Sequence, residues 1–163
     1  MDTNVISRRQ ATKDDPDPPA SRWIRRNAHL IRISAVTIAE VRRGLALETV
    51  RIERLKDARA RRRDQAVLAI KTAWYGQLRS RFADRIVAID ADVAERWADV
   101  SVRFPSLRDG DKAILATALV HRYGIATRNL SDFKASPVPL VNPFDPATWW
   151  GADSEAVARP GSG

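Results

Sequence analysis

The feature that most constrains the fold is an alternation between two hydrophobic periods along the chain. Short runs rich in β-branched residues stand at 30–34, 85–90 and 125–127, with a last one at 139–141. Between them, apolar residues recur every three or four positions, which is the period of an amphipathic helix. Strands that alternate with helices in this way predict an α/β fold around a mainly parallel sheet.

The longest helical stretch follows the first of these runs. Residues 35–50 have helical periodicity, and Thr37 with Glu40 fits the S/T-x-x-E capping box that often begins a helix. The pattern continues through 51–83, whose expected apolar face comprises Val67, Ile70, Trp74, Leu78 and Phe82. We therefore expect one long helix or a helical hairpin here.

Three shorter helices complete the expected order of elements. Residues 20–30 follow a proline pair and predict a short helix that turns Trp23 and Ile24 inward. Residues 91–104 and 109–124 predict two more, which follow the second run and precede the third. Helices placed between successive strands are what a parallel sheet requires.

The length of 163 residues favours a single domain with a core of its own. We place this domain at residues 1–148 and expect residues 149–163 to form a tail that is disordered at its end. The adjacent Trp149 and Trp150 would either stack on nucleic-acid bases or pack the terminal segment onto the body. Packing is the more common role, and we favour it.

Composition restricts the function classes. The chain has no cysteine, which excludes disulfides, thiolate zinc sites and cysteine nucleophiles. It shows neither a signal peptide nor an apolar run near the ~20 residues of a membrane-spanning helix, so we expect a cytoplasmic protein without membrane contact. A formal net charge of +8 favours a polyanionic partner, chiefly nucleic acid.

Four acidic residues are expected at the edge where a parallel sheet binds its ligands. In open α/β sheets, ligands bind beyond the carboxyl ends of the strands. The positions that meet this rule are Asp2, Glu40, Asp111 and Asp132. Carboxylates packed together repel one another unless cations neutralise them, and oxygen ligands suit Mg²⁺ or Mn²⁺. The sequence therefore predicts a divalent-metal site built from these four residues.

Two of these assignments have a competitor nearby. Asp109 offers the same helix start as Asp111, but the apolar residues that follow Asp111 place Asp111 in the better register. Asn129 competes with Asp132 for the fourth position, and we favour Asp132.

Basic residues gather in two places. Arg42 and Arg43 follow Glu40 by a turn or less, so we expect them to bind the substrate phosphate. The segment 51–64 is rich in arginine and has three readings: a solvated helix face, a rail for RNA phosphates, or a docking surface for an acidic protein segment. We keep all three readings open.

Four segments carry a family resemblance: DTNVIS from residue 2, ISAVTIAEVRRG from 33, DKAILATAL from 111, and ATRNLSDF from 126 with NPF after it. Together and in this order they resemble the PIN-domain ribonucleases, and most closely the VapC and FitB type of toxin in bacterial toxin–antitoxin pairs. The resemblance spans residues 2–144. It implies a PIN-like three-layer α/β/α sandwich with a central, mainly parallel sheet.

The resemblance also implies an activity. It is that of a metal-dependent endoribonuclease, which hydrolyses RNA phosphodiester bonds with a metal-bound water and leaves a 5′-phosphate. The family's Mg²⁺ or Mn²⁺ ligands map onto Asp2, Glu40, Asp111 and Asp132. Asn4 and Asn129 would hydrogen-bond the carboxylates or the water, and Thr127 would contact a phosphate. The implied partners are structured RNA such as tRNA, a cognate antitoxin and a second copy of the chain.

The beginning of the chain departs from the family pattern. Only Met1 precedes Asp2, whereas a strand typically has about five residues. We expect either that the true start lies upstream or that the first strand is truncated. The second case leads to an alternative function, a PIN-fold nucleic-acid-binding or regulatory module with weak or no catalysis.

Overall fold

The structure, a computed structural model, describes residues 1–2, 5 and 18–149. The predictions made for Asn4, Trp150 and the tail 151–163 lie outside these residues. The helices are α2 (Pro19–Arg26), α3 (Ala35–Glu53), α4 (Ala58–Arg81), α5 (Ala91–Arg103), α6 (Asp109–Val120) and α7 (Leu130–Phe133). The strands are β1 (Ile33–Ser34), β2 (Ile86–Val87), β3 (Ile125–Ala126) and β4 (Leu140–Val141), and 3₁₀ turns occupy Ala83–Arg85 and Pro146–Thr148.

The strands form two parallel pairs, and the first two residues of the chain lie between them. β1 pairs with β2, and β3 pairs with β4. The Met1 amino group donates a hydrogen bond to the Arg32 carbonyl (2.9 Å), and the Asp2 amide donates one to the Ala126 carbonyl (3.0 Å). Met1 and Asp2 therefore occupy the central position expected of a first strand, with Asp2 beside the end of β3.

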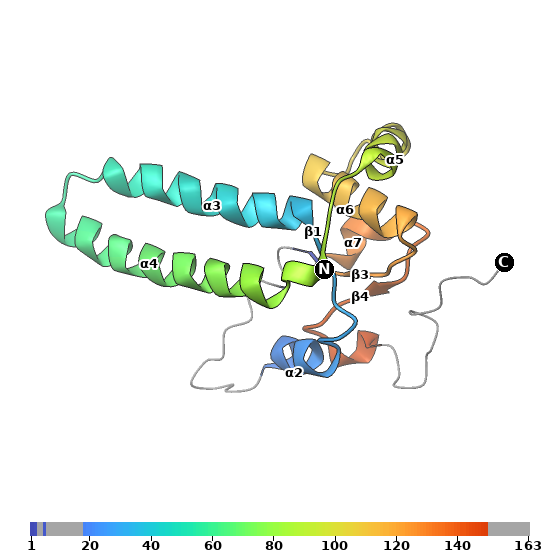
Figure 1. Ribbon diagram of the computed structural model, residues 1–163, viewed down its shortest axis with the longest axis horizontal. Helices are drawn as coiled ribbons and strands as arrows, with labels where there is room; N and C mark the ends of the chain where they lie inside the picture. The colour runs from blue at the N-terminus through green and yellow to red at the C-terminus, as the bar shows by residue number, and fades with distance from the viewer. Residues whose placement is uncertain (3–4, 6–17, 150–163) are drawn as a thin grey trace.

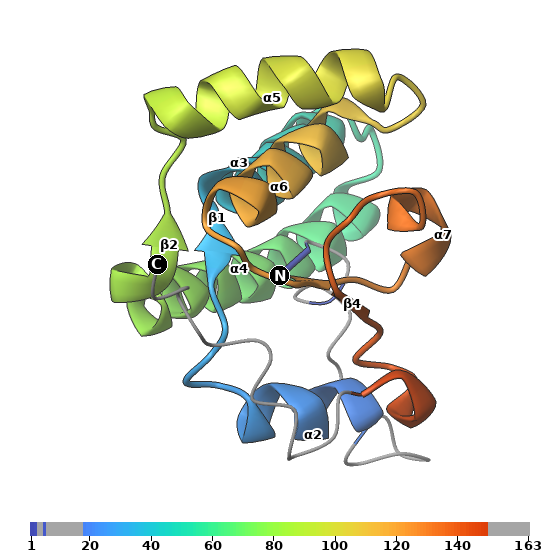
Figure 2. The same cartoon turned by 90° about the vertical axis from the view of Figure 1, so that its right-hand side faces the viewer.

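Helices cover both faces of the strands, as the three-layer prediction requires. Figure 2 shows α3, α5 and α6 above the strands and α2 below them. One apolar cluster joins α2 and the end of α4 to the strands and includes Trp23, Leu78 and Ala126. The other joins α5, α6 and α7 to the strands and includes Leu115 and Ile125. Ile125 and Ala126 enter different clusters because successive strand side chains point to opposite faces.

α3 and α4 form an antiparallel hairpin that extends away from the strands (Figure 1). α3 ends at Glu53 and α4 begins at Ala58, where the Asp57 carboxylate accepts hydrogen bonds from two backbone amides. The hairpin alternative is therefore confirmed over one long helix. Two ion pairs cross the hairpin, Glu48–Lys71 at 2.8 Å and Arg51–Asp64 at 2.9 Å.

The apolar face predicted for α4 is only partly buried. Leu78 and Phe82 are buried and Trp74 packs against them, but Val67 and Ile70 are exposed. These two residues are exposed because the outer half of the hairpin projects beyond the body of the protein (Figure 1). Long as α3 and α4 are, no helix in the described part of the chain combines the length and apolar character that crossing a membrane needs.

The start of α3 differs from the predicted capping box. Ser34, the last residue of β1, is the N-cap, and its hydroxyl accepts a hydrogen bond from the Val36 amide. Because the helix follows the strand without a loop, Thr37 already lies inside it, where its buried hydroxyl donates to the Met1 carbonyl. The capping-box prediction is therefore wrong, and Glu40 lies in the second turn of α3.

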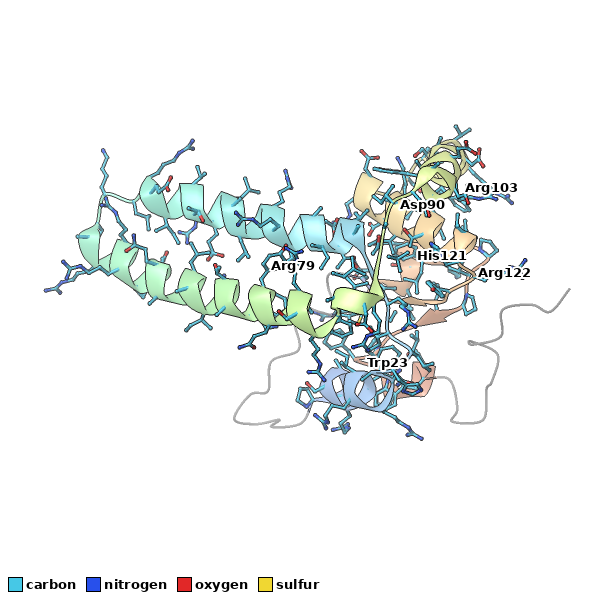
Figure 3. All side chains as sticks on the ribbon, in the orientation of Figure 1. Trp23, Arg79, Asp90, Arg103, His121 and Arg122 are labelled. Atoms are coloured by element: carbon cyan, nitrogen blue, oxygen red, sulfur yellow. The ribbon has the colours of Figure 1, made fainter. Side chains whose placement is uncertain are left out.

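Two tryptophans at opposite ends of the chain pack into the same region. Trp23 is buried and points from α2 toward the strands in Figure 3, so the inward orientation predicted for it is confirmed. Trp149 is partly buried and packs against the cluster that contains Trp23. The packing role that we favoured for Trp149 is therefore confirmed.

Candidate active site

Four carboxylates from four segments of the chain lie at one edge of the strands. Glu40 belongs to α3, which follows β1, and Asp132 belongs to α7, which follows β3. Asp111 is in the first turn of α6, and Asp2 lies between β1 and β3. We call these four residues the acidic cluster. This is the edge at which parallel sheets bind ligands.

Asp111 is the member whose charge responds most clearly to the other three. Burial raises the pKa of Asp111, and the negative charge of Asp2 raises it further. The guanidinium of Arg108 lowers this pKa, whereas Glu40 and Asp132 raise it again. A carboxyl group held in this balance becomes easier to ionise when a cation approaches.

Position distinguishes Asp111 from its neighbour Asp109. The Asp109 side chain is 85% exposed and pairs with Lys112 at 3.2 Å. The Asp111 side chain is only 14% exposed and is influenced by the charges of the acidic cluster. Residues two apart on a helix do not face the same way. The geometry therefore brings Asp111, and not Asp109, to the cluster.

A chain of hydrogen bonds connects Asp2 to Asp132. Asp2 is buried, and its Oδ2 accepts a hydrogen bond from the Thr127 hydroxyl at 2.8 Å. The Thr127 hydroxyl accepts one from the Asn129 backbone amide at 3.1 Å, and the Asn129 side-chain amide donates to Asp132 at 3.4 Å. Because Thr127 is fully buried, it orients Asp2 instead of reaching a phosphate.

Gly110 allows Glu40 to approach the start of α6. A Cβ atom at Gly110 would collide with the Glu40 carboxylate, which lies against this position. A side chain at position 110 would therefore force the Glu40 carboxylate to move. The sequence reasoning missed this requirement, because the contact joins two helices and leaves no periodic signal in either.

Of the two arginines expected to bind substrate, one shares a helix face with the acidic cluster. Arg42 and Arg43 are both exposed on α3. Arg43 stands three residues beyond Glu40 and lies on the same face, whereas Arg42 stands two residues beyond and points elsewhere. A phosphate at the cluster is therefore better placed for Arg43 than for Arg42.

Arg108 is a residue of this site that the sequence pattern did not single out. It is the N-cap of α6, and its guanidinium Nε lies 3.3 Å from Asp111 Oδ2. Its Nη2 lies 3.7 Å from Asp132 Oδ2. The i, i+3 spacing of Arg108 and Asp111 is a signal that indicates the first contact. The second contact depends on the tertiary fold.

The donor set of the acidic cluster suits a hard divalent cation, because it consists of carboxylate oxygens. As they stand, no three acidic or histidine side chains in the described ranges are grouped closely enough to hold a metal ion. The Arg108 guanidinium instead supplies the positive charge next to Asp111 and Asp132. The cluster fits a cation in charge and chemistry, and binding one requires the side chains to rearrange.

Neither histidine lies at the acidic cluster. His121 follows the last residue of α6, at the end opposite to Asp111, and Figure 3 shows it there near Arg122. His29 is exposed in the segment after α2. Ribonuclease chemistry based on paired histidines would need both rings at the reacting phosphate. This arrangement does not provide that.

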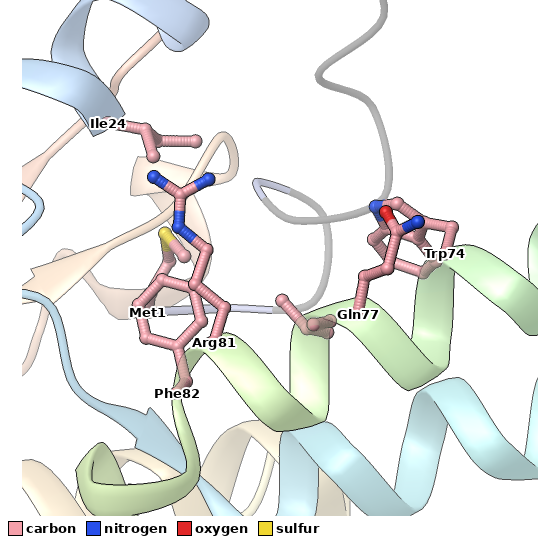
Figure 4. Close-up of a pocket in the computed structure, with 7 residues that line it drawn as sticks. Met1, Ile24, Trp74, Gln77, Arg81 and Phe82 are labelled. Atoms are coloured by element: carbon pink, nitrogen blue, oxygen red, sulfur yellow. The ribbon is translucent and has the colours of Figure 1, made fainter.

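A small cavity of about 100 Å³ is lined by residues of α2 and α4 and by Met1 (Figure 4). Its lining includes Met1, Ile24, Trp74 and Arg81, and contains no acidic residue. A cavity without a carboxylate, and with the guanidinium of Arg81 in its lining, is a poor site for a divalent cation. The acidic cluster is therefore the better candidate for the site of chemistry.

Comparisons with known sequences reveal several relatives. A sequence model of the PIN domain matches residues 1–135. The chain is 30% identical to the VapC ribonuclease Y4jK of Sinorhizobium fredii, over 90% of this chain and 98% of the relative. It is 29% identical to Toxin FitB of Neisseria gonorrhoeae, over 88% and 96% of the two chains. It is 27% identical to the plasmid stability protein StbB of Pseudomonas syringae pv. tomato, over 89% and 97%.

Solved structures share the fold. The structure of FitAB bound to an IR36 DNA fragment has a TM-score of 0.63 at 28% identity, and the match covers 88% of this chain and 94% of that one. The crystal structure of FitAcB from Neisseria gonorrhoeae has a TM-score of 0.60 at 29% identity, with 88% and 96% covered. The likeness therefore extends over nearly the whole of both chains.

Proposed function

Since the chain belongs to the PIN-domain family and is of the VapC and FitB toxin type, we propose that it is a divalent-metal-dependent endoribonuclease, the toxin of a toxin–antitoxin pair. The family resemblance and the PIN-like α/β fold read from the sequence are confirmed. The observation that carries the proposal is the acidic cluster, in which the charges of three carboxylates act on Asp111.

The proposed metal ligands are the four carboxylates of the acidic cluster. Asp2 and Asp111 are the primary ligands, and Glu40 and Asp132 complete the set directly or through water. A bound Mg²⁺ or Mn²⁺ would supply positive charge that acidifies water and stabilises negative charge on the phosphate. Thr127 would keep the Asp2 carboxylate in position through its 2.8 Å hydrogen bond.

The proposed substrate is structured RNA such as tRNA. The net charge of +8 favours a polyanion, and Arg43, on the same face as Glu40, is our first choice to bind the phosphate, ahead of Arg42. Hydrolysis by water would leave a 5′-phosphate and a 3′-hydroxyl. In the basic segment 51–64, three arginines are engaged within the hairpin: Arg51 and Arg63 with Asp64, and Arg61 with the Leu55 carbonyl. The solvated-face reading therefore fits these three.

The proposed protein partner is a cognate antitoxin. Relatives that bear the names VapC ribonuclease and Toxin FitB, together with the FitAB and FitAcB structures, support this partner. We further propose a homodimer, which the family resemblance implies, and a cytoplasmic location. The acidic cluster would be the natural target of a basic inhibitory side chain, because opposite charges attract most strongly where carboxylates converge.

The first test is cleavage of a labelled pool of structured RNA, tRNA included, with Mn²⁺ and with EDTA. Asp111→Asn keeps the size of the side chain and removes a proposed ligand charge, so cleavage should fall at least about 100-fold. Asp109→Asn is the matched control, since it makes the same change two residues earlier on an exposed side chain that pairs with Lys112. Its rate should equal that of the unaltered protein.

The outcomes separate two functions. Cleavage that requires metal, leaves 5′-phosphate ends and disappears in Asp111→Asn supports the endoribonuclease. RNA binding without cleavage by folded protein would favour the alternative, a PIN-fold nucleic-acid-binding or regulatory module. Equal losses in Asp109→Asn and Asp111→Asn would contradict the choice of Asp111 as a ligand.

A further inference from the structure

A positive charge from the chain itself lies within the acidic cluster. Arg108 stands at the start of α6 and contacts Asp111 in the same helix at 3.3 Å. The same guanidinium reaches Asp132, in α7, at 3.7 Å. One side chain therefore bridges two carboxylates that come from different segments and that both belong to the proposed metal ligand set.

The Arg108 guanidinium offsets the negative charge of Asp111 and Asp132, as a metal ion would. Carboxylates that converge repel one another, and a cation between them offsets that repulsion. Arg108 acts in this sense on Asp111, opposing the effects of Asp2, Glu40 and Asp132. A divalent cation carries twice the charge of a guanidinium and would need the same carboxylate oxygens. The two cations are therefore alternatives at these oxygens.

The contacts of Arg108 are of a kind that a metal ion can displace. Its side chain is 74% exposed. Both distances are longer than the roughly 2.7–2.9 Å of a charge-assisted hydrogen bond, and exposed ion pairs contribute little to stability. The side chain also makes no capping hydrogen bond at the start of α6. Its removal should therefore alter the charge of the site more than the fold.

We propose that Arg108 competes with the divalent cation for Asp111 and Asp132, and so sets the metal concentration at which the site assembles. The inference rests on the proposed function, because it takes these two carboxylates as metal ligands. Arg108 acts here as a positioning residue for the metal-free carboxylates, and it leaves them when the cation binds.

The test is calorimetric titration of the full chain with Mn²⁺ alone, without RNA. Arg108→Ala should bind Mn²⁺ about threefold to tenfold more tightly than the unaltered protein, because a competing positive charge is gone. Arg108→Lys keeps the charge and should bind nearly as the unaltered protein does. Asp111→Asn should abolish the tight binding and so locate it at the acidic cluster.

Arg96→Ala is the matched control. Arg96 pairs with Asp99 at 3.5 Å with the same i, i+3 spacing, on the exposed face of α5. Its removal lowers the net charge of the protein by the same amount, but at a distance from the acidic cluster. The Mn²⁺ affinity of Arg96→Ala should equal that of the unaltered protein, so any general effect of net charge is measured separately.

The outcomes distinguish the inference from the function on which it rests. If Arg108→Ala binds Mn²⁺ no more tightly than Arg96→Ala, the competition is refuted while the metal site stands. If neither the unaltered protein nor Arg108→Ala binds Mn²⁺, the proposed metal site fails and the competition fails with it. Should Arg108→Ala not fold, as judged by circular dichroism, Arg108→Gln removes the charge with less change of shape and decides the matter.

Discussion

Helix α6 and the outer half of the α3–α4 hairpin use apolar residues in different ways. α6 has 12 residues and buries six in a row, from Ala113 to Ala118, because α5, α3 and the strands surround it. α4 has 24 residues and buries only Leu78, near its end, since its outer half has α3 as its neighbour and projects from the body (Figure 1). The helical period shows which face is apolar, and tertiary structure decides whether that face is covered.

The two regions also differ in how they treat carboxylates. In the hairpin, hydrogen bonds from Arg51 and then Arg63 lower the pKa of Asp64. At the acidic cluster, burial and the charge of Asp2 raise the pKa of Asp111, against the single opposing effect of Arg108. Asp64 in the hairpin is neutralised by two arginines, whereas the four carboxylates of the acidic cluster keep an excess of negative charge. Such an excess is typical of functional sites.

The largest expected contrast between the two regions is in packing. Leu115→Ala in α6 should lower the free energy of unfolding by about 2–5 kcal/mol, because Leu115 is fully buried and a cavity would remain. Ile70→Ala in the hairpin should change it by no more than about 0.5 kcal/mol, since Ile70 is 71% exposed. Urea denaturation measures both. Similar losses in the two variants would show that a partner or a second copy covers the hairpin.

The next contrast concerns two threonine hydroxyls. Thr127→Val removes the 2.8 Å hydrogen bond to the buried Asp2 carboxylate, so we expect a loss of about 1–3 kcal/mol in stability and a drop of about 10–100-fold in RNA cleavage. Thr49→Val removes a hydroxyl that donates to the Leu45 carbonyl within its own helix at 3.0 Å. Denaturation and cleavage assays on this variant should match those of the unaltered protein. A Thr127→Val protein with full activity would contradict the supporting role of Thr127.

Two glycine-to-alanine substitutions should differ in effect: one should raise stability, and the other should weaken metal binding. Gly76→Ala in the hairpin meets open space, with nothing within 4 Å, and should stabilise the protein by about 0.5–1 kcal/mol because alanine is the better helix former. Gly110→Ala should displace the Glu40 carboxylate and weaken Mn²⁺ binding about tenfold. Thermal melting and calorimetry measure the two effects. Stabilisation by both substitutions, with metal binding intact, would show that Glu40 can move without consequence.

The smallest expected contrast is in pH dependence. The raised pKa of Asp111 means that its stabilising contribution is present below the usual 3.8 and is lost as pH rises through the raised value. The lowered pKa of Asp64 means that its contribution is present above 3.8 and is lost as pH falls through the lowered value. Unfolding curves at a series of pH values should therefore show opposite trends when Asp111→Asn and Asp64→Asn are each compared with the unaltered protein. Parallel trends would refute the contrast.

Local patterns account for the parts of the fold that the sequence predicted well. The helices at α5 and α6 have apolar residues at helical spacing, and these residues are buried: Val93 and Val100 in one, and Ile114 in the other. The same spacing predicts that Asp111 faces inward and Asp109 does not, and their exposed fractions of 14% and 85% agree with this, because helix periodicity and burial coincide in a helix that is surrounded. The exposed Val67 and Ile70 show the limit of this reasoning in a helix that is not.

The details of the candidate site depend on contacts between segments that are distant in the sequence. Gly110 makes room for Glu40 across two helices, and Arg108 reaches Asp132 in α7. Ser34 replaces the predicted cap because β1 runs directly into α3. No propensity or motif contains these contacts. They follow from where the fold places each backbone, so the sequence indicated the residue types of the candidate site and Asn129 as a support, but not these contacts.

The hydrogen bond from Thr127 to Asp2 has a consequence for how the protein is made. It joins residues 125 positions apart. The Asp2 carboxylate can therefore be held by this hydrogen bond only after β3 and Thr127 are in place. Closing so long a loop costs conformational entropy before the contact can stabilise the chain. During translation, Asp2 emerges before the other members of the acidic cluster and Asp132 after them. A chain that stops short of β3 therefore has no assembled acidic cluster, whichever of its other elements have folded.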